Sequence, residues 1–222
     1  MGSMSLSLNL ACPCKEIYTE RAQLLLPLFP DPKDDDKKGP LTSQFVSTIN
    51  SHSNPASIWI RLMSEDPSVL KSMHCSNKKC GEKQRKLSTF CPDNPSLRRF
   101  GFKRLQDTLK YYPKLWNVKC PCRAVRCEEN VSNCHVYLEL DCRERATDPG
   151  SKLYDLPTSL NLSREYRLAG VVSYDATYDH FVAYCCRRTG TWGYHDGLLS
   201  KVKPVKGNPV IQPECALYLI NQ

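Results

Sequence analysis

The stretch that decides the fold is residues 166–197, which read YRLAGVVSYDATYDHFVAYCCRRTGTWGYHDG. Two apolar runs, RLAGVVSY and HFVAYCC, are separated by a polar turn, and a second turn, RRTGTWG, follows them. Alternating or strand-forming apolar runs that are bounded by turn residues predict neighbouring antiparallel strands. His180 opens the second run, and Asp196 follows the second turn, so a hairpin is expected to carry both.

The strand character continues on both sides of this stretch. CHVYLELDC at 134–142 alternates between apolar and polar residues, and ECALYLIN at 214–221 is another apolar run near the end of the chain. The turns between the runs are rich in Gly, Asp and Ser, as hairpin connections are. From residue 134 onward we therefore expect one antiparallel sheet.

Helices are expected upstream of this sheet. LRRFGFKRLQDTLKYY at 97–112 places Leu105 and Leu109 one helical turn apart, and 41–73 is interpreted as a helix, a break and a second helix. KEIYTERAQLLLPLF at 15–29 predicts a short amphipathic helix. Helices that precede an antiparallel sheet in this way indicate the α+β class.

The 222 residues carry a net charge of +8, and 41% of them are hydrophobic, which suits a globular chain with a real core. We interpret 1–40 as an irregular N-terminal segment and 41–222 as one domain. No run approaches the roughly 18–20 apolar residues of a membrane helix, and the start lacks the pattern of a secretory signal. A cytoplasmic or nuclear protein without a membrane partner is expected.

Thirteen cysteines are many for this length, and their number is odd. Without a signal peptide, reduced thiols, some of them on a metal, are favoured over a disulfide framework. Four residues separate Cys75 from Cys80, and one residue separates Cys120 from Cys122. Two short cysteine pairs joined by a longer insertion are typical of a structural zinc site. The alternative is a set of metal-free thiols.

Five further histidine and cysteine residues lie near these pairs in the sequence. His74 and Cys127 are spare ligand candidates beside the two pairs. Cys91, Cys134 and Cys142 are interpreted as core or loop residues, because the last two flank an alternating strand and suit packing there.

The 166–197 stretch resembles the C-terminal box of the ubiquitin-specific protease family. That box is a Tyr-x-Leu-x-x-Val-Val strand, a loop, His-aromatic-Val-Ala-Tyr, a turn, and then a Trp and an Asp. The matching residues here are Tyr166, Leu168, Val171, Val172, His180, Phe181, Val182, Ala183, Tyr184, Trp192 and Asp196. Residues 139–162 resemble the family's palm segment, and ECALYLIN resembles its last strand.

This resemblance implies a papain-like cysteine protease palm at about 134–222 and a zinc-bearing fingers insertion at about 74–142, with the thumb truncated. In such an isopeptidase a histidine takes the proton of a thiol nucleophile and an acid orients the imidazole. The resemblance gives these roles to His180 and Asp196, each opening one strand of a hairpin and facing the other across the sheet edge. It implies that Cys75, Cys80, Cys120 and Cys122 hold zinc.

The family's N-terminal box, Gly-Asn-Thr-Cys-Tyr-x-Asn, is not found in this chain. NLACPCKEIYTERAQLL is the segment most similar to that box. Cys14 is therefore the candidate nucleophile, and Cys12 is the second choice. Asp179 stands where the family has a glycine before the histidine, and its side chain is expected to narrow the passage of the ubiquitin tail.

Two functions follow from these observations. The first is a ubiquitin carboxyl-terminal hydrolase-like protein, catalytically impaired or truncated, that binds ubiquitin or a ubiquitin-like modifier; activity on another modifier is a variant of it. The alternative is a basic zinc-binding module that contacts nucleic acid, the less favoured partner, through KKCGEKQRK (78–86) and RRFGFKR (98–104). There, Phe100 and Phe102 are placed among basic residues as stacking surfaces would be.

Overall fold

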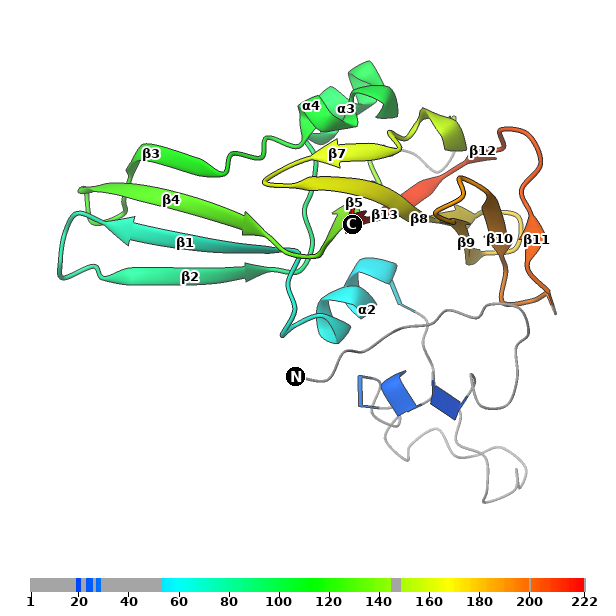
Figure 1. The fold of residues 1–222 in the computed structure, drawn as a ribbon, viewed down its shortest axis with the longest axis horizontal. Helices are drawn as coiled ribbons and strands as arrows, with labels where there is room; N and C mark the ends of the chain where they lie inside the picture. The colour runs from blue at the N-terminus through cyan, green and yellow to red at the C-terminus, as the bar shows by residue number, and fades with distance from the viewer. Residues whose placement is uncertain are drawn as a thin grey trace.

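The computed structural model describes residues 19–20, 23–25, 27–28, 53–144, 149–199 and 201–221. Within these ranges the structure is dominated by antiparallel sheets, with a few short helices (Figure 1). None of the described helices is long and apolar enough to cross a membrane. The predicted combination of an antiparallel sheet with a smaller number of helices is confirmed.

Four strands form one sheet, which we call the distal sheet. Their order is β2-β1-β4-β3, and all three pairings are antiparallel. In Figure 1 this sheet extends away from the rest of the molecule as a long, flat projection. Its strands are β1 (Val69–Cys75), β2 (Glu82–Leu87), β3 (Lys114–Lys119) and β4 (Val125–Ser132).

Seven strands form the second sheet, which we call the central sheet. The order is β11-β10-β9-β8-β13-β5, and β7 pairs with the beginning of β8. A separate two-stranded sheet joins β6 (Ser151–Lys152) to β12 (Val210–Ile211). The central strands are β5 (His135–Glu139), β7 (Ser159–Asn161), β8 (Glu165–Asp175), β9 (His180–Cys186), β10 (Trp192–His195), β11 (Lys203–Pro204) and β13 (Pro213–Ile220).

Helices pack on both faces of the central sheet. Strand β5 shows this directly, because successive side chains of a strand point to opposite faces. Val136 and Leu138 belong to the main core with residues of α3 (Asn94–Phe100) and α4 (Leu105–Thr108), whereas Tyr137 belongs to a smaller cluster with Ala56 of α2 (Pro55–Leu62). Figure 1 accordingly draws α3 and α4 on one side of the sheet and α2 on the other.

The spacing of buried residues along β8 follows from a bulge. Tyr166 and Leu168 are buried two residues apart, but the next buried residue, Val171, is three further on. The pairing of β8 with β13 shifts register at this point, between Leu217 and Tyr218 of β13. A bulge adds one residue to a strand and so changes which face the following side chains occupy. The Tyr-x-Leu-x-x-Val spacing is thus the sequence signature of the bulge.

Two helical predictions are wrong in part. Residues 69–73, expected to be helical as the end of 41–73, belong to β1, because the chain leaves α2 and pairs with β2 and β4. The expected helix at 97–112 is broken at Gly101, whose φ of 77° no helix accommodates; α3 ends there, and a 3₁₀ turn, η2 (Phe102–Arg104), leads into α4.

Two further predictions concern the ends of the expected helices and strands. Of the amphipathic helix at 15–29, residues 19–20 and 23–25 are helical and the others lie outside the described residues or in a turn. Cys134 was expected to pack at the end of a strand, but it lies in a bend before β5 and is exposed. Cys142 is half-buried against the main core, as predicted.

Candidate functional site

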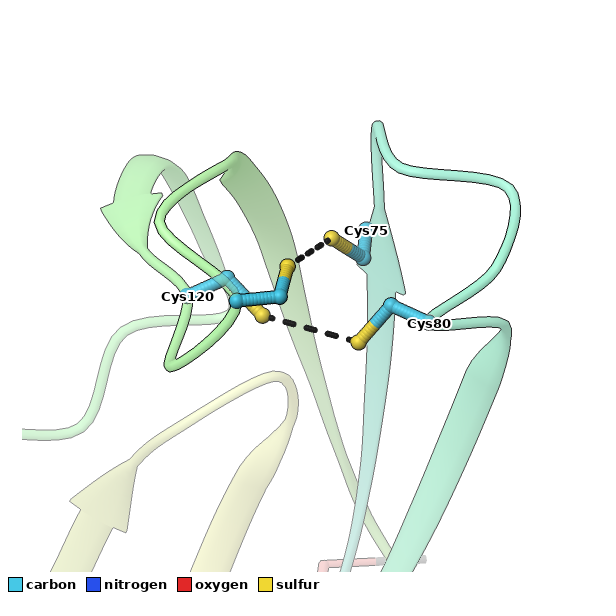
Figure 2. A group of neighbouring side chains, drawn as sticks. Cys75, Cys80 and Cys120 are labelled. Atoms are coloured by element: carbon cyan, nitrogen blue, oxygen red, sulfur yellow. Dashed lines mark hydrogen bonds between the residues drawn. The ribbon is translucent and has the colours of Figure 1, made fainter.

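Four cysteines meet at the far end of the distal sheet. Cys75 ends β1 and Cys80 lies in the turn before β2, while Cys120 and Cys122 lie in the turn between β3 and β4. Figure 2 shows the thiols of Cys75 and Cys80 facing the turn that carries Cys120. The two cysteine pairs, which are far apart in the sequence, come together because β1 lies beside β4, with Cys75 opposite Arg126.

The sulfur positions suit a tetrahedral zinc ion. All four sulfur atoms lie within 4.8 Å of one another, with Cys75 and Cys122 3.4 Å apart and Cys80 and Cys120 3.7 Å apart. Four Zn–S bonds of about 2.3 Å in a tetrahedron place the sulfurs about 3.8 Å from each other. The predicted ligand set is therefore brought together in a geometry that fits structural zinc.

The thiols differ in how readily they ionise. The backbone N–H of Cys122 and, to a smaller extent, hydrogen bonds with the other thiols together lower the pKa of Cys120 to about 7. Although a backbone hydrogen bond at Asn77 favours the Cys75 thiolate, burial and the neighbouring thiols raise the pKa of Cys75 to about 12. Zinc binds thiolates and displaces their remaining protons, so its binding here is expected to weaken in acid.

The two spare ligand candidates are outside this cluster. His74 and Cys127 are direct neighbours across the β1–β4 pairing. His74 Nε2 lies 3.8 Å from a carboxylate oxygen of Glu82, and neither His74 nor Cys127 belongs to the group of four sulfurs. The four cysteines are a complete tetrahedral set without them.

A second candidate site, on the central sheet, is a histidine–aspartate pair at the end of the β9–β10 hairpin. His180 opens β9, and Asp196 follows the last residue of β10, where the antiparallel pairing places it beside the start of β9. His180 Nε2 and Asp196 Oδ1 are 3.1 Å apart. The two residues therefore meet, as the sequence predicts. The predicted position of Asp196 at the start of a strand is wrong, because Asp196 directly follows the end of β10.

Asp196 is held by three donors. The backbone N–H of Leu198 donates to Oδ1 at 2.9 Å, and the hydroxyl of Tyr194 donates to Oδ2 at 3.3 Å. The Leu198 N–H, followed by His180, lowers the pKa of Asp196 below its usual range. Burial and the Asp196 carboxylate raise the pKa of Tyr194 to about 12, so its hydroxyl keeps its proton.

Sequence reasoning did not identify Tyr194 as part of this site. Tyr194 and Asp196 are two residues apart, which is the spacing of side chains that share one face of a strand. That spacing was the available signal, but a tyrosine near an aspartate is common in strands and does not by itself indicate a contact.

The other nitrogen of the His180 ring is the open position of the pair. His180 Nδ1 is buried and has no hydrogen-bond partner. Cys14 and Cys12, the candidate nucleophiles, lie outside the described residues, and within the described part of the chain no thiol hydrogen-bonds to His180. The pair can thus orient an imidazole whose Nδ1 is available for a proton, which is the arrangement a thiol nucleophile needs.

Asp179 occupies a backbone conformation that glycine favours. Its φ is +53°, in the left-handed region, and its Oδ1 accepts a hydrogen bond from the Tyr174 hydroxyl at 2.7 Å. This hydrogen bond is the first cause of a raised pKa at Tyr174. The chain therefore keeps the turn that a glycine would make and fixes an acidic side chain next to His180.

The basic segment at 98–104 does not form the stacking surface that the alternative function needs. Phe102 is only 6% exposed and belongs to the main core, while Phe100 is exposed and lies against the Arg99 guanidinium. Three of the neighbouring basic residues are engaged by carboxylates: Arg98 by Glu144, Lys103 by Asp155 and Arg104 by Asp107. The alternation of aromatic and basic residues at 98–104 reflects a buried phenylalanine, so nucleic-acid binding is not favoured.

No family model and no curated protein matches this chain. Among solved structures, the SAGA DUB module of Ubp8, Sgf11, Sus1 and Sgf73 bound to monoubiquitin is similar over 69% of this chain and 40% of the matched chain, at 17% identity and a TM-score of 0.41. A yeast SAGA DUB module with an Sgf73 mutant is similar over 70% and 41%, at 17% identity and a TM-score of 0.40.

The Saccharomyces cerevisiae PAN2 pseudoubiquitin-hydrolase is similar over 72% of this chain and 58% of the matched chain, at 16% identity and a TM-score of 0.37. The chain thus spans about 40% of the length of the two DUB-module chains that it resembles. The similar structures are ubiquitin-hydrolase-type modules by name.

Proposed function

We propose that this chain is a ubiquitin carboxyl-terminal hydrolase-like protein that binds ubiquitin or a ubiquitin-like modifier and is impaired as an enzyme. The observation that carries the proposal is the His180–Asp196 pair, within the sequence box at 166–197 that resembles the ubiquitin-specific proteases. The proposal includes the papain-like palm, the fingers with zinc and the truncated thumb that this resemblance implies.

The pair supports this proposal because one nitrogen of His180 is held and the other is not. Asp196 accepts a hydrogen bond from Nε2–H, which fixes the tautomer with the lone pair on Nδ1. In an active isopeptidase, Nδ1 would take the thiol proton, the thiolate would attack the isopeptide carbonyl, and the proton would then pass to the leaving lysine amine. Water would hydrolyse the resulting thioester.

Impairment is proposed because this half-site has no nucleophile among the described residues. The family's cysteine box is absent from the sequence, and Cys14 matches it by position alone. A chain that retains the histidine half of the site and the sheet around it keeps the surface over which a modifier tail would run. Binding without turnover is the function that fits both observations.

The test of impairment is hydrolysis of a fluorogenic ubiquitin C-terminal amide by the wild-type chain, Cys14→Ala and His180→Ala. We expect no turnover above the buffer rate by any of the three proteins, with zinc content and folding confirmed. Turnover by the wild-type chain that both substitutions abolish would overturn the claim of impairment and make Cys14 the nucleophile. Labelling by a ubiquitin vinyl probe that Cys14→Ala removes would have the same meaning.

A further inference from the structure

A second group of metal-ligating side chains lies where α2 meets the start of β5. The ligand atoms of Asp66, Cys134 and His135 all lie within 4.8 Å of one another. The sulfur of Cys134 is 3.7 Å from Nδ1 of His135. None of these residues belongs to the four-cysteine cluster, and neither the proposed function nor the resemblance uses them.

A bend in the backbone brings the two neighbouring residues together. Consecutive side chains in a strand point to opposite faces, so Cys134 and His135 would diverge if both were in β5. Strand β5 begins at His135, and Cys134 lies in the bend before it. The bend leaves the imidazole in the buried face of the sheet and turns the thiol toward the same ring.

Neighbouring groups hold the Asp66 and His135 side chains and the backbone of Cys134. The Asn133 side-chain amide donates to the Asp66 carboxylate and, at 3.2 Å, to the carbonyl of Pro67, and its oxygen accepts the Cys134 N–H at 2.9 Å. The His135 ring meets Trp59 edge-on, with centroids 5.3 Å apart. Such outer contacts are what orient the ligands of a metal in proteins.

Burial and exposure are divided among the three residues in a way that suits a bound ion. His135 is 4% exposed, and its Nε2 is buried without a hydrogen-bond partner, whereas Asp66 and Cys134 are exposed. The ring directs Nδ1, not the unpartnered Nε2, toward the exposed Cys134 thiol, so Nδ1 is the nitrogen that would bind an ion at this position. The exposed thiol and carboxylate leave the position between the three groups open to an ion from solvent.

We propose that Asp66, Cys134 and His135 form a second zinc site, with a fourth position open to water or a small ligand. Thiolate, imidazole and carboxylate together are a ligand set that zinc accepts, and three protein ligands with one open position distinguish such sites from closed structural ones. Tetrahedral Zn–S and Zn–N bonds place sulfur and nitrogen about 3.6 Å apart, close to the observed 3.7 Å. On binding, the Cys134 thiol proton is released to solvent.

The test is the zinc stoichiometry of the full chain, followed by titration with Zn²⁺ against a chromophoric chelator. The wild-type chain is expected to bind two zinc ions, one tightly and one more weakly. Cys134→Ser and Asp66→Asn, which change exposed side chains, are expected to weaken only the second ion, by at least about tenfold. Cys91→Ser, another exposed cysteine outside the cluster, is the matched control and keeps both ions.

Cadmium-113 NMR assigns each ion to its ligands, because the shift depends on the number of bound sulfurs. We expect two resonances, one from four thiolates that Cys120→Ser removes and one from a single thiolate that Cys134→Ser removes. A wild-type chain that binds one ion when the four-cysteine cluster is intact would overturn the proposal. So would a second ion whose affinity and resonance are unchanged in both Cys134→Ser and Asp66→Asn.

Discussion

Phe100 and Phe102 are two phenylalanines in one basic segment with opposite environments. Phe102 is in the main core and Phe100 is exposed on α3. Phe102→Ala is expected to lower the free energy of unfolding by about 3–4 kcal/mol, because a buried ring is lost and a cavity remains. Phe100→Ala, the control, is expected to change it by less than about 0.5 kcal/mol. Chemical denaturation measures both, and equal losses would contradict this assignment of the core.

Asp196 is expected to make stability depend on acid pH. The Leu198 N–H and His180 lower its pKa in the folded chain, so the folded state favours the carboxylate more than the unfolded state does. This contribution is fully present above the usual aspartate pKa of about 3.9 and is lost as pH falls below it.

The comparison that checks this expectation is wild type against Asp196→Asn, by denaturation at neutral pH and near pH 3. The difference in unfolding free energy between the two proteins should be largest at neutral pH and should shrink in acid. A difference that stays constant, or grows, would mean that Asp196 is not stabilised by these donors in the folded chain.

The site residues divide according to whether sequence carries their signal. His180 and Asp196 were found because they lie in a motif of fixed order, and the hairpin brought them within hydrogen-bond distance. The four cysteines were found by their spacing. Tyr194 and the Asp66–Cys134–His135 group were missed. Their contacts depend on the strand face or the bend in which each residue lies, and a short sequence pattern predicts neither.

At the level of elements, Gly101 is what divides the predicted helix at 97–112. Its φ is +77°, and a Cβ built there meets nothing within 4 Å, so the cost of a side chain is backbone strain alone. Gly101→Ala is expected to cost roughly 1–3 kcal/mol of stability, because the backbone conformation at φ 77° and ψ 171° is essentially restricted to glycine. Gly197→Ala is the matched control, because its surroundings are equally open and its φ is outside the left-handed region. Equal effects of both substitutions on thermal unfolding would contradict this account.

The strands were predicted where two-residue alternation is clear and were missed where it is not. Strands β8, β9 and β13 carry apolar runs between turns, and sequence identified all three. Strand β1 (VLKSMHC) carries its apolar residues at Val69, Leu70 and Met73, which is not a two-residue alternation, so its pattern does not predict a strand. Its strand character comes from pairing with β2 and β4, which no local window reports.

The distal sheet is expected to depend on zinc more than the central sheet does. Its four strands are mostly half-buried or exposed, and the cysteine cluster closes its far end. Chelation should therefore raise amide hydrogen exchange in β1 to β4 and leave β8 and β13, which form the core, little changed. Cys120→Ser should reproduce the effect without chelator. Uniform loss of protection across both sheets would show that the two sheets unfold as one unit.

For the molecule as a whole, the sequence predicted a combination of helices with an antiparallel sheet, but not the division of the strands into a distal and a central sheet. The α+β class followed from helices placed before a run of strands, and the antiparallel sheets confirm it. The boundaries at 40, 74, 134 and 142 stay predictions, as do the papain-like palm and the truncated thumb.

The central claim is that the His180 end of the central sheet binds the tail of ubiquitin or a related modifier. The most direct measurement is an NMR titration of isotope-labelled ubiquitin, with ubiquitin-like modifiers in parallel, by the zinc-loaded chain. We predict saturable shift changes that include the modifier's C-terminal tail. Tyr178→Ala and Phe181→Ala, exposed beside His180, should weaken them, while Phe100→Ala, exposed on α3, should not. No shift change with any modifier, from a folded zinc-loaded chain, would contradict the account.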